Sequence, residues 1–207
     1  MKYLVKIFIF SSLLFGALNV QAQVTGVQYA ILYNSETQLL NCYIYIDEGK
    51  ANGIRDRVQF NAQYSLLIPT GAQINIESSF MPLIDNQKFL GIKPVQWNIS
   101  SSLISPEVIP EFDLYGLTPT LAPAGFYNNL EKGDLVKIFS ISIEGDGVDV
   151  NQVRLFDNDL DPHSHDKGMK NGDFSNGFTM GGYHQLYTGI KIINQEEANY
   201  TSLDKEK

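Results

Sequence analysis

The sequence has little cysteine. Its 207 residues include one, Cys42, so no disulfide bond can form within the chain. Cys42 shares a predicted strand face with Ile44 and Ile46, and no histidine lies near it in the sequence to serve as a base. The surroundings of Cys42 therefore predict a small buried side chain and give no support to a cysteine nucleophile.

Positive charge is also scarce. Lys and Arg number 15 against 23 Asp and Glu, which gives a formal net charge of −8 at pH 7. An acidic surface repels the phosphates of nucleic acids and the headgroups of anionic lipids. We therefore expect neither nucleic acid nor an anionic membrane surface as a partner.

Familiar catalytic motifs are missing too. No Gly-x-Ser-x-Gly nucleophile elbow occurs. The glycine-rich run 172–182 lacks the Gly-Lys-Ser/Thr ending and the following helix of a phosphate-binding loop. No long amphipathic helix alternates with the strands, which argues against an α/β fold. The sequence therefore predicts a protein that is not an enzyme.

The N-terminus has the layout of an export signal. Lys2 and Lys6 precede an apolar stretch at 7–18, and small and polar residues lead to a cleavage site after Ala22. The apolar stretch is short for a membrane-spanning helix, and no cysteine for lipid attachment follows the cut. We expect a signal peptide at 1–22, a secreted or periplasmic protein without a membrane segment after cleavage, and a mature chain two charges more negative.

The rest of the chain reads as short strands between turns. In the clearest, 58–66, apolar and polar residues alternate with period two, so that one strand face is buried and the other is wet. The other predicted strands are 29–33, 39–47, 74–76, 95–100, 135–143, 153–156, 178–187 and 190–193. This pattern predicts an all-β fold, a two-sheet antiparallel sandwich or a barrel, as one domain over residues 23–194.

Two segments lack the alternation. Residues 104–127 contain four prolines and are predicted to form a long surface connection. Residues 195–207 are polar and charged and are predicted to form a flexible tail.

The most unusual segment is an acidic loop. Asp157, Asp159 and Asp161 alternate as the oxygen ligands of calcium loops do. The helix–loop–helix calcium motif fails, because Pro162 stands where it needs Gly and Gly168 where it needs Glu. A different calcium loop, with calcium as the cofactor, and a solvated acidic loop both remain open.

The same loop contains two histidines. His163 and His165 are spaced to face one side of an extended chain, and Asp166 or His184 could complete a zinc or copper site. Ordinary surface histidines are the alternative.

Aromatic residues suggest a second kind of site. If Trp97, Tyr183 and Tyr187, with Tyr43 and Tyr45, face solvent, their rings could stack on sugars. Core packing is the alternative for aromatic residues in sheets.

Three stretches carry a family resemblance: 26–65, the turn Leu130-Glu131-Lys132-Gly133-Asp134 with the strand after it, and 172–178. Together they resemble the cohesin-like and carbohydrate-binding sandwich domains of secreted surface proteins of Bacteroidota. The resemblance implies a jelly-roll-like sandwich of about nine strands that serves adhesion, or binding to carbohydrate or protein. It implies no catalytic residues.

Three functional hypotheses follow. The first is a secreted, non-catalytic binding or adhesion module for an extracellular glycan or a cell-surface protein. The second is a metal-binding protein or metal-dependent enzyme that uses the loop at 157–166. The third is a structural subunit that assembles with itself through its sheet edges.

Overall fold

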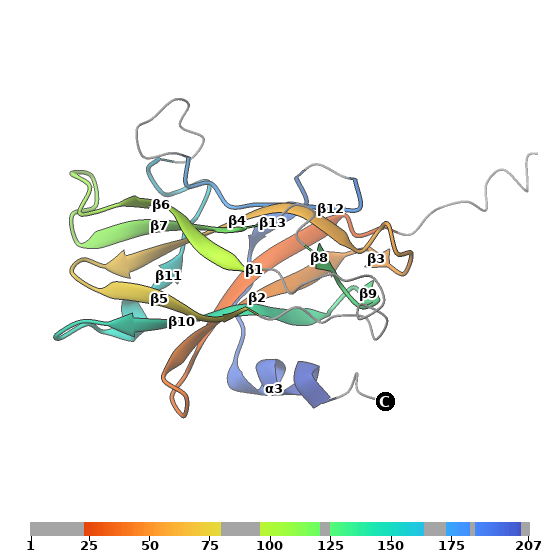
Figure 1. Ribbon diagram of the computed structural model, residues 1–207, viewed down its shortest axis with the longest axis horizontal. Helices are drawn as coiled ribbons and strands as arrows, with labels where there is room; N and C mark the ends of the chain where they lie inside the picture. Colours follow the sequence, from red (N-terminus) through yellow and green to blue (C-terminus); the bar gives the residue numbers. More distant parts are fainter. Residues whose placement is uncertain (1–22, 80–95, 121–124, 164–172, 183–184, 204–207) are drawn as a thin grey trace, which may run out of the picture.

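A computed structural model describes residues 23–79, 96–120, 125–163, 173–182 and 185–203 (Figure 1). The predicted signal peptide lies outside these ranges. Within them, no helix has the length and apolar character needed to span a bilayer.

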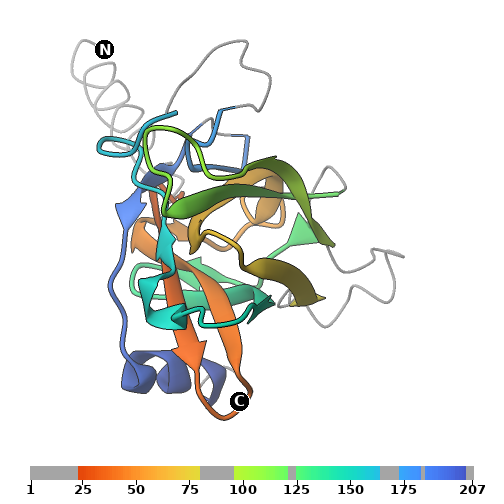
Figure 2. The same cartoon turned by 90° about the vertical axis from the view of Figure 1, so that its left-hand side faces the viewer.

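The described strands form two main sheets that pack against each other, so the predicted all-β sandwich is confirmed (Figures 1 and 2). The first sheet has the order β13 (Tyr187–Ile190), β1 (Gly26–Asn34), β2 (Leu39–Glu48), β10 (Leu135–Glu144) and β5 (Gln73–Ser79). The second has the order β11 (Arg154–Leu155), β4 (Val58–Pro69), β7 (Phe112–Pro119) and β6 (Trp97–Leu103), and β12 (Gly177–Met180) and β8 (Gly125–Phe126) also pair with β4. The short strands β3 (Lys50–Ala51) and β9 (Leu130–Glu131) pair with each other.

The main core lies between the sheets and is rich in aromatic rings. Tyr29 of β1 stacks on Tyr64 of β4, with 4.3 Å between ring centroids. The Tyr64 hydroxyl donates a hydrogen bond to the Ala30 carbonyl, 2.5 Å away, and so ties the second sheet to the first. Burial raises the pKa of both tyrosines well above the ordinary value. Cys42 is fully buried in this core, as predicted, and burial raises the pKa of its thiol as well.

One sheet contact departs from the predicted antiparallel pattern. β13 pairs with β1 in the parallel direction, while the other ladders are antiparallel. The described part of the chain contains thirteen strands, several of them only two residues long. The sequence pattern predicted fewer because such short strands show no periodicity.

The prediction of a surface connection at 104–127 is wrong for the middle of this segment, which forms strand β7. β7 runs through it and lies between β4 and β6, in the interior of the second sheet. Leu114 and Leu117 are fully buried. The prolines that suggested a loop flank this strand, since Pro110 precedes it and Pro119 is its last residue. Proline at a strand end removes no ladder hydrogen bond from the interior.

The alternation predicted for β4 breaks at Phe60. Its neighbours on the predicted inner face, Ala62 and Tyr64, are buried, but Phe60 is 45% exposed. The register against β12 skips Phe60, because Thr179 lies opposite Asn61 and Met180 opposite Gln59. This bulge turns the Phe60 ring outward and Gln59 into the protein.

Residues 195–203, expected to belong to a loose tail, form helix α3 (Gln195–Leu203) beside the first sheet (Figure 2). Ala198 is buried in a small cluster with Ala30, Tyr43 and Leu135. Alternation along β1, β2 and β10 places this cluster on the outer face of the sheet. The helix has few apolar residues, so its sequence alone gave no amphipathic signal.

Candidate binding surface

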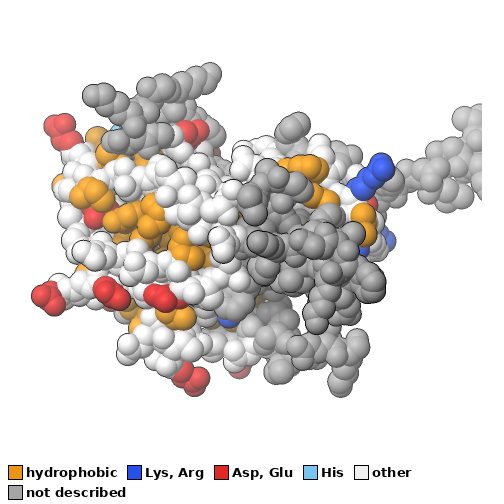
Figure 3. All heavy atoms as spheres, viewed as in Figure 1, with side chains coloured by type: hydrophobic (Ala, Val, Ile, Leu, Met, Phe, Trp, Pro, Cys, Tyr) orange, Lys and Arg blue, Asp and Glu red, His pale blue; other side chains and the backbone are white. Residues whose placement is uncertain are grey.

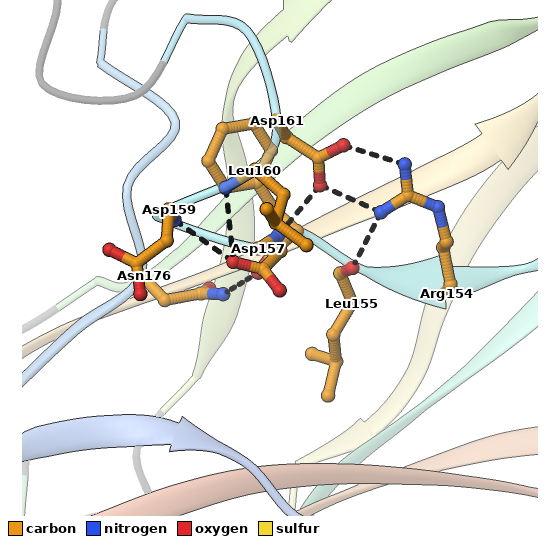
Figure 4. Close-up of polar contacts among 8 residues, drawn as sticks. Arg154, Leu155, Asp157, Asp159, Leu160, Asp161 and Asn176 are labelled. Atoms are coloured by element: carbon orange, nitrogen blue, oxygen red, sulfur yellow. Dashed lines mark hydrogen bonds and ion pairs between the residues drawn. The ribbon is translucent and has the colours of Figure 1, made fainter.

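The acidic loop is built around an ion pair (Figure 4). Arg154 at the start of β11 donates two hydrogen bonds to the Asp161 carboxylate, at 2.6 and 2.7 Å. The Asp161 side chain is almost fully buried, while Arg154 remains partly exposed. The hydrogen bond and the charge of Asp161 raise the pKa of Arg154. Arg154 therefore supplies the positive charge that Asp161 needs in this position.

Backbone amides also donate hydrogen bonds to the carboxylates of Asp157 and Asp161 (Figure 4). Asp157 Oδ1 accepts hydrogen bonds from the backbone N–H groups of Asp159 and Leu160, at 2.9 and 3.2 Å. Asp161 Oδ2 accepts one from the Asp157 N–H at 2.7 Å. These bonds form a self-capped turn of the kind that Asp residues stabilise.

The four predicted metal ligands that the structure describes, Asp157, Asp159, Asp161 and His163, do not form a metal site by themselves. Among the described residues, no group of three or more His, Cys, Asp or Glu side chains is placed to hold a metal ion. His163 has a positive φ of 67°, and its carbonyl accepts a hydrogen bond from the Phe174 N–H at 3.2 Å. His165, Asp166 and His184 lie outside the described residues.

Asn176 anchors this loop, a role that the sequence did not reveal. Its buried side chain accepts from the Ser65 N–H at 2.7 Å and donates to the Phe156 carbonyl at 2.6 Å. Its backbone exchanges two hydrogen bonds with the Asn158 amide group, at 2.7 and 2.9 Å. The signal was weak because Asn176 lies in a glycine-rich run that resembles ordinary turns.

The predicted aromatic platform is not formed by Trp97. This residue is buried in the main core, where its ring lies 4.7 Å from that of Phe139 between centroids. Trp97 begins β6 at the edge of the second sheet, so its ring faces the opposing sheet and cannot stack on a sugar in solution.

The other predicted aromatic ligands that the structure describes lie on strands of the first sheet. Tyr187 lies on β13 in the first sheet, half-buried, with its ring 4.9 Å from that of Tyr29. Burial raises the pKa of Tyr187 to about 12. Tyr43 is buried, Tyr45 lies under Lys191 with 5.0 Å from Nζ to the ring centroid, and Tyr183 lies outside the described residues.

Three of the eight exposed large apolar side chains among the described residues lie on the hairpin formed by β6 and β7. Ile99 is 40% exposed on β6, and Ile104 and Val108, in the turn after it, are 58% and 60% exposed. We call Ile99, Ile104, Val108, Glu107 and Glu111 the hairpin surface. Figure 3 shows apolar side chains on the half of the molecule that contains this hairpin, with acidic side chains along their border.

Hydrogen bonds fix the shape of the turn. The buried Asp113 carboxylate accepts from the Ser105 N–H at 2.8 Å and from the Thr70 hydroxyl, 3.1 Å away. Thr70 Oγ1 is also 3.0 Å from the Pro110 carbonyl oxygen. The Asp113 carboxylate is thus used for hydrogen bonds within the protein. Glu107 and Glu111 are the charged side chains that the turn exposes to solvent.

Comparison of the chain with models of protein families, with curated proteins and with solved structures gave no significant match.

Proposed function

We propose that the protein is a secreted, non-catalytic binding or adhesion module that engages an extracellular partner through the hairpin surface. The observation that carries this proposal is the exposure of Ile99, Ile104 and Val108 on a hairpin whose turn is held rigidly. Grouped exposed apolar residues with a polar rim are typical of interaction sites. A rigid turn also loses little conformational freedom on binding.

Three further points support this function. The N-terminal pattern is that of an exported protein. The resemblance to cohesin-like and carbohydrate-binding sandwiches implies binding or adhesion. The Asp157 and Asp161 carboxylates accept hydrogen bonds from Arg154 and from backbone amides, so the geometry of these two side chains favours a structural role over a metal-dependent activity.

The test compares two surface variants. The double variant Ile104→Asp/Val108→Asp places charge on the hairpin surface, and both positions are more than half exposed, so the fold is expected to persist. The control is Ile192→Asp, because Ile192 is 88% exposed and lies between β13 and α3, away from the hairpin. Immobilised protein is screened against a glycan array and against fractionated cell-envelope proteins, and each bound partner is titrated.

We expect the double variant to lose at least tenfold in affinity and Ile192→Asp to retain the wild-type value. Equal affinity of the double variant and the wild type would place the binding site elsewhere. A turnover activity without any bound partner would reject the proposed function.

A further inference from the structure

We propose that the edge of β6, which no described strand pairs with, binds an extended, positively charged peptide segment of the partner protein, which adds to the second sheet as an antiparallel or parallel strand. This inference rests on the proposed function, because the β6 edge adjoins the hairpin surface. Strand addition draws its affinity from backbone hydrogen bonds and its selectivity from alternate side chains.

The β6 edge lacks charge and proline, two of the devices that protect edge strands. β6 is the last strand of the second sheet, and in the described part of the chain only β7 pairs with it. It is seven residues long and contains neither a charged residue nor a proline. By contrast, β5 contains Glu77, and β13 has four residues and is followed by Lys191. Charges, prolines, short length and bulges all hinder edge pairing, and of these β6 has only a bulge, between Ile99 and Ser101.

The register shows which backbone groups the edge offers. The hydrogen bond from Thr70 N to Glu111 O shows that the backbone N–H and C=O groups of the odd-numbered residues of β7 point toward β4. Those of the even-numbered residues therefore point toward β6. Ser102 lies opposite Tyr115, so its backbone N–H and C=O point away from β7. The hydrogen bond from Thr120 N to Gln96 O fixes the same alternation at the other end of β6. The backbone N–H and C=O of Ile99, which lies opposite Leu117, therefore also point away from β7.

A bulge separates these two outward positions. The register shifts between Ile99 and Ser101, and the hydroxyl of Ser100 donates to the Gly116 carbonyl at 3.0 Å. Since Ile99 and Ser102 lie on either side of the bulge, an incoming strand would bond at two points. The small serine side chains allow its backbone to approach closely.

Charge decides the kind of partner. Between residues 96 and 120 the hairpin has three acidic residues, Glu107, Glu111 and Asp113, and no Lys or Arg. The whole chain has a net charge of −8, so a second copy would be repelled. A strand with Lys or Arg on alternate positions would be attracted to the turn while its apolar residues contact Ile99.

The probe is a fluorescein-labelled ten-residue peptide that alternates lysine and valine, titrated by fluorescence anisotropy. Two matched peptides are its controls, one with glutamate in place of lysine and one with N-methyl groups on alternate backbone amides. We expect saturable binding of the lysine peptide, at least tenfold weaker binding of the methylated one, and no saturation with the glutamate one. Binding should weaken as salt rises.

The protein variants are Ser102→Pro, which removes the outward N–H without touching the ladder to β7, and Ser102→Ala, which keeps it. We expect a tenfold loss for Ser102→Pro and an unchanged affinity for Ser102→Ala. If Ser102→Pro does not fold, the methylated peptide tests the same hydrogen bonds on the unaltered protein.

Equal binding of the methylated and plain peptides, or no binding of any peptide, would overturn the inference. A wild-type dimer in sedimentation velocity that Ser102→Pro converts to a monomer would also overturn it and would make a second copy the occupant. If the peptides fail while Ile104→Asp/Val108→Asp still loses an envelope partner, strand addition is wrong and the proposed function stands.

Discussion

The outer faces of the two sheets each carry a small apolar cluster, but they are covered in different ways. On the first sheet, helix α3 contributes Ala198 to the cluster that includes Tyr43 and Leu135. On the second sheet, Leu67 and Leu114 are covered by Phe156 and Phe174 from the acidic loop and the segment that follows it. We call these the helix cover and the loop cover.

Among the described side chains, those of the loop cover are the more deeply buried. Phe156 and Phe174 are fully buried, with 6.4 Å between ring centroids, and Asn176 and the Arg154–Asp161 pair fix the chain around them. The helix cover has one buried alanine among its described side chains. A segment without secondary structure can thus be anchored more firmly than a helix, because burial and satisfied hydrogen bonds determine the stability.

The largest expected effect is that of Phe174→Ala. It leaves a cavity in the loop cover and should lower the free energy of unfolding by about 3–5 kcal/mol. The counterpart Ala198→Asp in the helix cover should lower the free energy of unfolding by about 1 kcal/mol, because the helix can move away from the sheet and let water reach the new carboxylate. Denaturant unfolding of both variants measures the difference, and equal losses would contradict the ranking of the two covers.

Next in size is Asn176→Ala. It leaves the Ser65 N–H and the Phe156 carbonyl without their partner, and each orphaned buried group costs about 1–3 kcal/mol. Asn151→Ala is the control, because Asn151 is exposed and bonds within its own turn to Asp149. A thermal shift for Asn176→Ala no larger than for Asn151→Ala would show that the loop cover does not depend on this side chain.

A smaller effect is expected from alkaline pH. Burial raises the pKa of Tyr187, which contacts Asn176, to about 12, and raises that of Tyr43 under the helix cover. In the unfolded chain, the tyrosine hydroxyls ionise near pH 10. The stability from these groups is therefore complete below pH 10 and is lost as the pH rises toward 12.

Tyr187→Phe should reduce the loss of unfolding free energy at alkaline pH more than Tyr43→Phe does. Urea unfolding at pH 9 and pH 11 measures it. An alkaline loss that is the same in both variants would assign it to the fully buried tyrosines of the main core.

The smallest expected effect is that of calcium. Because Arg154 and backbone amides already engage Asp157 and Asp161, added Ca²⁺ or a chelator should leave the melting temperature unchanged. A bound ion at 100 times its dissociation constant would add about 2.7 kcal/mol. A rise of the melting temperature by several degrees with Ca²⁺ would show that the acidic loop binds the ion.

Much of the fold was predictable from local pattern. The strands predicted at 39–47 and 58–66 have alternation or long apolar runs, and the structure confirms them as Leu39–Glu48 and Val58–Pro69. β7 was missed because its prolines outweighed its short apolar run, although Pro110 and Pro119 mark its ends. The candidate site was predictable in part: the acidic loop was singled out, but its pairing with Arg154 depends on β11 and the loop folding back together.

Alternating side chains and turn residues determined by themselves that this chain forms an all-β fold with Cys42 inside. Tertiary structure alone decided which residues stay exposed: Trp97 is buried and Phe60 is not, although both lie in similar alternating runs. The reason is that period two assigns residues to strand faces, whereas a bulge, a sheet edge or a covering segment from a distant part of the chain decides which face meets water.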